Sequence, residues 1–195
     1  MTEIELPEFE ELEEMKNKSF SRRVALVTAI FAVMLALASL GGNNATKEML
    51  LAQQQASDQW SFYQSKVMRE QIYKIQKMRM QLDLLERGSL MKDAIREKYE
   101  SMLRQLEDEE TRYNQEKKEI QEEARKLEHE REVNRSRDPY FDYAEALLQI
   151  SIVMASISIL AVSRPIFYFS IGLASLGAAL TLNGYLLIFR LSIFH

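Results

Sequence analysis

Three long apolar stretches and one long polar stretch divide the chain. The apolar stretches run over 24–42, 146–163 and 166–189 and contain no charged residue. Each is about as long as the roughly 20 residues that an α-helix needs to cross a bilayer core. The polar stretch over 44–137 carries a sparse apolar stripe at steps of three and four, which is typical of a long amphipathic helix. The pattern predicts an all-α membrane protein with three transmembrane helices.

The polar stretch is interrupted once, at 87–89. Gly88 suits the end of a helix, and Ser89 suits the start of the next one. We therefore expect two helices folded back on each other as a long antiparallel coiled-coil helical hairpin. The apolar stripes of the two arms match best when Met49 lies beside Leu127 near the root and Leu82 beside Ile95 near the turn.

The apolar seam of this hairpin is thin, because Gln71, Glu110 and Lys117 interrupt it. A lone pair of helices with so few large apolar contacts buries little surface. We therefore expect hairpins to bundle with one another or with a partner. The alternative is a single helical pair stabilised mainly by its membrane roots. Trp60, the only tryptophan, is expected opposite Lys117, where a cation–π contact would form.

Polar and helix-breaking residues set the expected element boundaries. Glycine and asparagine at 41–44 are expected to end the first span, and Asp138-Pro139 to end the hairpin and begin the second span. The predicted order is an acidic N-terminal tail over 1–23, transmembrane helix 1 over 24–42, the hairpin over 43–138, transmembrane helix 2 over 139–163, transmembrane helix 3 over 165–190 and a C-terminal tail over 191–195.

Small residues recur at steps of three and four on one face of each apolar stretch. Such seams allow helices to approach closely inside lipid. We expect them to pack helix against helix and to assemble copies of the chain into a homo-oligomer. The seam residues are Ala25, Ala29, Ala32, Ala36 and Ser39 in the first span, Ser151, Ala155 and Ser158 in the second, and Ser170, Ala174, Gly177, Thr181 and Gly184 in the third.

Only two notable polar side chains lie inside the apolar stretches, Gln149 and Asn183. Proton relays and ion sites usually require ionisable groups within the membrane, and none occurs there. We expect Gln149 and Asn183 to hydrogen-bond to each other, within or between subunits. Packing is favoured over a pore lining for this pair.

The charge balance and the residue types bound the possible chemistry. The 25 basic and 29 acidic residues oppose a nucleic-acid surface, which requires a basic excess. Without cysteine, neither a disulfide nor a thiolate metal site can form. His129 has no second histidine three or four residues away, as a metal pair on a helix would need. We expect no catalytic residue, cofactor or metal site.

Basic residues just before the first apolar stretch predict the orientation. Arg22 and Arg23 place the N-terminus in the cytoplasm, the hairpin outside the membrane and the turn at Arg164 inside. A cleaved signal peptide is the alternative for this stretch, because Ala36-Leu37-Ala38 resembles a cleavage site. The acidic tail over 2–15 is expected to be solvated, or else to dock to a basic protein partner.

Residues 21–66, SRRVALVTAIFAVMLALASLGGNNATKEMLLAQQQASDQWSFYQSK, resemble a bacterial family of small membrane proteins that is classified only as a domain of unknown function. The layout is similar too, with one N-terminal span, a long polar helical middle and two closing spans. The resemblance implies a bacterial inner membrane and a retained first span. It implies no activity, cofactor or catalytic residue.

These observations lead to one main functional hypothesis. We expect a non-enzymatic, homo-oligomeric inner-membrane protein in contact with lipid, whose hairpin acts as a scaffold or binds a protein partner. A channel or mechanosensitive pore built from the same oligomer is the first alternative, because the seam hydroxyls suit a water-filled lining. An auxiliary subunit of a transporter or envelope complex is the second.

Overall fold

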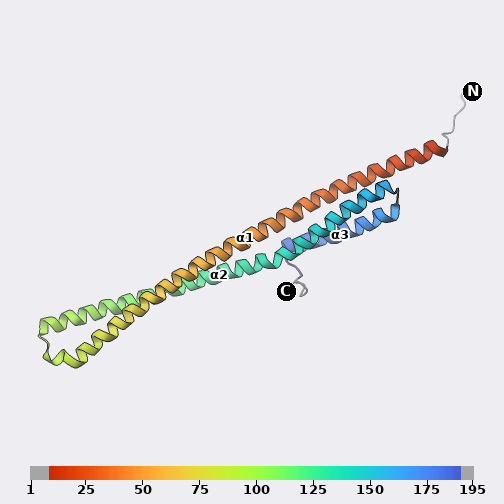
Figure 1. Cartoon of the computed structure of the whole chain (residues 1–195). Helices are drawn as coiled ribbons and strands as arrows, with labels where there is room; N and C mark the ends of the chain where they lie inside the picture. Colours follow the sequence, from red (N-terminus) through yellow and green to blue (C-terminus); the bar gives the residue numbers. More distant parts are fainter. Residues whose placement is uncertain (1–8, 190–195) are drawn as a thin grey trace, which may run out of the picture. The chain divides into compact units, whose positions relative to one another are not determined.

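The chain is all-α. The computed structural model describes the backbone of residues 9–189 and the side chains of residues 14–189. Four elements follow one another, the helix α1 (Phe9–Arg87), the 3-10 helix η1 (Gly88–Leu90), and the helices α2 (Asp93–Leu160) and α3 (Arg164–Leu186) (Figure 1). No strand occurs between residues 9 and 189. The predicted C-terminal tail over 191–195 lies outside the described residues. The same holds for the side chains of the acidic segment up to residue 13, where docking to a partner was predicted.

All three α-helices are long and apolar enough to cross a membrane. Two of the predicted helix ends are wrong, however, because α1 continues through residues 41–44 and α2 continues through Pro139. Gly41 and Gly42 lie against the Phe141 side chain of α2 and so allow α1 and α2 to pack closely. Asp138 accepts a hydrogen bond from the Thr46 hydroxyl (2.8 Å) and does not begin a new helix. Tertiary packing overrides both breaks in the pattern.

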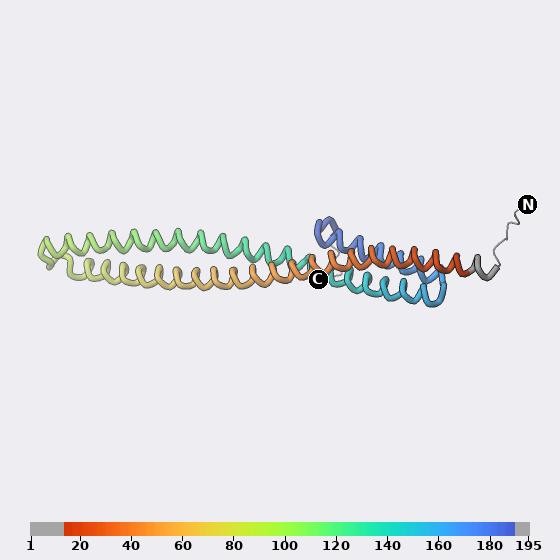
Figure 2. Tube along the Cα trace, turned by 90° about the horizontal axis from the view of Figure 1, so that it is seen from above, coloured from red at the N-terminus to blue at the C-terminus, as the bar shows by residue number. Residues whose placement is uncertain are grey.

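The described chain forms two compact units. Among the described residues, the first comprises 9–48 and 133–189, and the second comprises Met49–Glu132. In the first unit, the beginning of α1 packs beside the end of α2 and beside α3 (Figure 2). This three-helix bundle contains all the strongly apolar stretches of the sequence.

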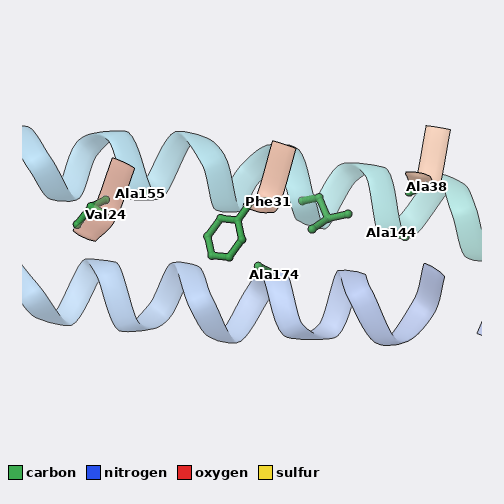
Figure 3. Close-up of a cluster of buried hydrophobic side chains, with 7 residues drawn as sticks. Val24, Phe31, Ala38, Ala144, Ala155 and Ala174 are labelled. Atoms are coloured by element: carbon green, nitrogen blue, oxygen red, sulfur yellow. The ribbon is translucent and has the colours of Figure 1, made fainter. Parts of the chain in front are cut away.

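The core of the bundle repeats every seven residues along α1. Val24, Phe31 and Ala38 are buried there, and the ring of Phe31 lies between α2 and α3 (Figure 3). The same cluster contains Ala144, Leu148 and Ala155 from α2 and Ala174 from α3. A repeat of seven residues keeps one face of a helix turned towards its neighbours over many turns.

The connection between α2 and α3 spans residues 161–163. Val162 has a positive φ of 47°, and the Ser163 N–H donates to the Ser158 carbonyl at 3.0 Å, which ends α2. Arg164 already belongs to α3, with Pro165 in the first turn, where its missing N–H costs no hydrogen bond. The turn therefore lies slightly before the predicted Ser163-Arg164-Pro165.

In the second unit, the end of α1 and the beginning of α2 lie antiparallel (Figure 2). Their connection extends from Gly88 to Lys92, whose carbonyl accepts the N–H groups of Ile95 and Arg96 at the start of α2. Trp60 Nε1 donates to Glu128 at 3.0 Å, although the predicted register placed Trp60 opposite Lys117. Lys117 bonds instead to Glu70, ten residues further along α1, so the predicted register is wrong.

Candidate functional site

The seams of α2 and α3 face each other and α1 inside the bundle. Ser151, Ala155 and Ser158 of α2 are buried, and so are Ser170, Ala174, Gly177, Thr181 and Gly184 of α3. A Cβ atom at Gly177 would lie 2.9 Å from Leu148 and 3.2 Å from the Ala144 carbonyl oxygen. The small residues thus allow close packing within a single chain.

The hydroxyl groups of these seams are satisfied within their own helices. Ser151 donates to the Leu147 carbonyl at 2.7 Å, and Thr181 donates to the Gly177 carbonyl at 2.9 Å. Ser158 and Ser170 each bond to the carbonyl three residues earlier in the same way. Such bonds remove the cost of burying a hydroxyl in an apolar environment.

The predicted seam of the first span lies on the outside of this bundle. Ala25, Ala29, Ala32 and Ala36 are exposed in the single chain, and Ser39 is half-buried. The neighbouring face with Val24 and Phe31 is turned inward. Larger side chains fill the space between three helices better than alanine, which explains this choice of face. The alanine face remains open to lipid or to another protein.

A phenyl ring enclosed by glycines joins the three helices of the bundle, and sequence reasoning did not identify it. Phe141 of α2 is 1% exposed. A Cβ atom at Gly41 or Gly184 would lie 2.4 or 2.9 Å from its ring, which excludes a side chain unless the ring moves, and a Cβ at Gly42 would make a tight contact of 3.2 Å with the Phe141 Cβ. We call these three glycines the glycine socket. The sequence did contain a signal, because glycine occurs in two apolar stretches. The pattern assigned Gly41 and Gly42 to the end of a helix and Gly184 to a seam.

Tyr185 closes the same junction on α3. Its ring meets Phe141 edge to face, with centroids 5.0 Å apart. Its hydroxyl donates to the Leu37 carbonyl of α1 at 3.0 Å. One aromatic pair and one hydrogen bond therefore tie α3 to both neighbouring helices.

Asn183 and Gln149 have separate surroundings. Asn183 Nδ2 donates to the Phe189 carbonyl at 2.8 Å, and Asn183 Oδ1 accepts the Phe189 N–H at 2.9 Å. Gln149 is exposed. The predicted hydrogen bond between the two within one chain is thus wrong. Asn183 instead bonds to the N–H and carbonyl groups of Phe189, which lie beyond the end of α3 and have no partner within a helix.

Charged pairs occupy the interior of the hairpin. Glu70 is 6% exposed and accepts hydrogen bonds from Lys117 and from Asn114 (2.9 Å). Burial alone would raise the pKa of Glu70, but the bonds from Lys117 and Asn114 outweigh it and hold the pKa below its ordinary value. Two further ion pairs join the arms, Lys66 with Glu116 and Lys77 with Glu110.

Tyr113 lies among these pairs and is 6% exposed. It stacks on Tyr73 with ring centroids 5.4 Å apart, and the Lys66 ammonium lies 5.2 Å from its centroid. Hydrogen bonds from Arg69 and Arg112 lower the pKa of the Tyr113 hydroxyl. Around Glu70 and Tyr113 the interior of the hairpin is therefore polar and aromatic where an apolar seam was predicted. Nearer the root, Ala56 and Ala124 of the predicted stripe are buried.

The large apolar side chains of the same region face outward on α1. Glu70, Tyr73, Lys77, Met80 and Leu84 form the inner face, which is buried or half-buried. Met68, Ile75 and Leu82 each lie two residues before a residue of this inner face. Two residues correspond to about 200° around the helix, so these three side chains face outward. We name the outward set the outer stripe, and its members are Met68, Ile72, Ile75, Met78, Leu82 and Leu85, which are 48–84% exposed.

A hollow of about 400 Å³ on the hairpin is lined by residues that include Lys77, Glu107, Glu110 and Lys118. Its charges are mixed, and Lys77 and Glu110 are already paired with each other. Within residues 14–189, no group of three histidine, aspartate or glutamate side chains is placed to hold a metal ion. His129 is exposed. The candidate functional surfaces of the described chain are therefore the faces on which its helices pack.

Comparison with known proteins identifies a family without an assigned activity. The family model described as domain of unknown function (DUF4337) matches residues 20–187. No curated protein matches the chain significantly, and neither does any solved structure. The family match confirms the resemblance seen in residues 21–66.

Proposed function

The chain belongs to the DUF4337 family of unknown function, and we propose that it is a non-enzymatic membrane protein that assembles with copies of itself. In this proposal the hairpin is a coiled coil that acts as a scaffold or binds a protein partner. The membrane is the cytoplasmic membrane of a bacterium, with the N-terminus inside and the hairpin outside.

One observation carries the proposal, the distribution of side chains in the half of the hairpin near its turn, where charged residues lie inside and large apolar residues lie outside. Ion pairs such as Glu70–Lys117 lie between the arms, whereas six large apolar side chains of the outer stripe face solvent. Burial of apolar surface is the dominant stabilising contribution to helix association in water. A hairpin that leaves its best apolar surface uncovered is built to be covered by another helix.

The bundle adds a second uncovered surface. The exposed alanines at 25, 29, 32 and 36 allow a neighbouring helix to approach α1 closely inside lipid. By contrast, a cysteine at Gly177 would collide with Leu148 of its own chain. Contacts between copies in the membrane are therefore expected through α1 and not through the α3 seam.

Measurement of the particle mass in detergent tests the proposal. Light scattering is expected to give a multiple of the 22.7 kDa chain mass after the detergent is subtracted. Ala29→Cys is expected to form a disulfide-linked dimer on oxidation, while Ala38→Cys, which is buried within one bundle, is the matched control. A strictly monomeric particle with no dimer at position 29 would overturn the proposal.

The orientation has its own test. Gly88 lies at the hairpin turn and has only Leu84 within 4 Å of an added Cβ, so cysteine is tolerated there. Gly88→Cys is expected to react with a membrane-impermeant thiol reagent in intact spheroplasts. Protection until the cells are lysed would show that the hairpin is cytoplasmic.

No observation within a single chain favours the pore. The hydroxyls that motivated it are buried between helices and bonded to their own backbone, as at Ser158 and Thr181. Silence of the reconstituted protein under voltage and tension is the expected result. Stoichiometric co-purification of another envelope protein would point instead to the auxiliary subunit.

A further inference from the structure

We propose that the outer stripe of α1 docks against the outer stripe of a second copy, with the two α1 helices parallel and in register. This inference rests on the proposed self-assembly and gives it a surface, a direction and a register. The stripe begins at Met68 and ends at Leu85, a length of about 26 Å along the helix.

The spacing of the stripe is that of a two-stranded coiled coil. Five residues of the stripe occupy the two core positions of a heptad, Met68, Ile75 and Leu82 in the first and Met78 and Leu85 in the second. Gln71 completes the six core positions, and Ile72 flanks them. Five of the six are apolar. A single polar residue such as Gln71 at a core position favours the register in which it meets its own copy.

The α2 arm of the hairpin offers no apolar stripe of this length, since its large exposed apolar side chains are Ile95 and Met102, both near the turn. On α2, the positions that face away from α1 include Ser101, Asp108, Gln115 and Glu122, which are all exposed and polar or charged. A partner surface must be apolar with the same spacing, and the stripe of a second copy meets both conditions. Because α1 is one helix from the bundle to Arg87, two copies inserted in the same sense present parallel α1 helices.

The area of the stripe suits copies that share a membrane. Six side chains that are 48–84% exposed offer less apolar surface per copy than the roughly 800 Å² that each partner buries in a free soluble complex. Three membrane spans hold the copies in one plane and raise their effective concentration, which offsets the smaller area.

Charges beside the stripe distinguish the parallel arrangement. In a parallel, in-register pair, Lys74 of one copy lies next to Arg79 of the other, five residues further along. This like-charge contact weakens the pair. Replacement of Arg79 by glutamate creates an attraction with Lys74 only if the helices are parallel and in register.

Disulfide trapping in the full-length protein tests the inference, because the natural chain has no cysteine. Ile75→Cys is expected to give a dimer under mild oxidation, at least tenfold faster than Gln115→Cys on the outer face of α2. Adding Leu82→Glu is expected to slow the trapping at least fivefold, and adding Arg79→Glu to accelerate it severalfold. Leu82 is 56% exposed, and an unchanged circular dichroism spectrum would show that the variant is folded.

The outcomes separate this inference from the proposed function. An oligomer in which Ile75→Cys reacts no faster than Gln115→Cys would overturn the docking surface and leave self-assembly intact. Slower trapping with Arg79→Glu would overturn the parallel register. A monomeric wild-type protein would overturn both.

Discussion

Removal of one member of the Glu70–Lys117 ion pair is expected to destabilise the hairpin more than removal of both. The Glu70 side chain is 8% exposed and that of Lys117 is 20% exposed. Loss of one partner of a buried pair generally costs about 3–5 kcal/mol, because the other charge stays buried. Lys117 keeps some contact with water, so Glu70→Leu is expected to cost about 2 kcal/mol.

The reverse substitution leaves a carboxylate that is more deeply buried. Lys117→Leu is therefore expected to cost about 3 kcal/mol, with Asn114 still donating a hydrogen bond to Glu70. In the double leucine variant no charge is stranded at this layer, and its stability is expected to lie within about 1 kcal/mol of wild type.

Native-state hydrogen exchange of the full-length protein in detergent measures these costs locally. Opening free energies that fall by about 2 and 3 kcal/mol accelerate exchange roughly 30-fold and 150-fold in peptides spanning the layer. The control is Glu123→Leu, which breaks an exposed pair with Lys126 and is expected to change exchange less than about fivefold. Equal exchange in wild type and both single variants, or a double variant worse than either, would show that the pair does not lie in the interior.

Three further predictions concern pH and the bundle. Because the pKa of Glu70 in the folded hairpin lies below its ordinary value of 4.5, its contribution is present above pH 4.5 and is lost as the pH falls through the folded value; acid unfolding followed by circular dichroism should therefore be less steep in the double leucine variant. Gly184→Ala, whose Cβ would lie 2.9 Å from the enclosed ring, is expected to lower the melting temperature in detergent by roughly 5 °C, whereas Gly172→Ala in the same helix has open space and is expected to change it little. Asn183→Ala loses both hydrogen bonds to the backbone beyond α3 and is expected to accelerate amide exchange there about tenfold, while the exposed Gln149→Ala leaves it unchanged.

The sequence was sufficient for the three long helices, because uncharged stretches of this length have few alternatives to a spanning helix. In α3 the small residues at steps of three and four are the buried ones, since only they permit close approach. In α1 the same spacing marked the outer face. Alanine is as compatible with lipid as with a helix interface, so its spacing alone does not choose a side.

The hairpin interior was not predictable from apolar periodicity. The stripe with Ile75, Met78 and Leu82 is a genuine repeat, and hydrophobic reasoning assigned it to the contact between the arms. The structure gives that contact to charged residues such as Glu70 and Lys77. Charged residues are normally expected to face solvent. Inside this hairpin, however, opposite charges from the two arms form ion pairs, which compensates for their burial. The steps of four around Gln71 mark where the apolar repeat leaves the interior.

The glycine socket predicts a pattern of intragenic suppression. Gly41, Gly42 and Gly184 come from two helices that are far apart in the sequence, yet all three contact the same side chain, Phe141. A methyl group that is harmful at Gly184 should be tolerated when Phe141 is shortened to leucine. The four positions then mutate as one epistatic unit, so a genetic screen for suppressors of Gly184→Ala would return changes in α2 and would map the helix packing without any structural measurement.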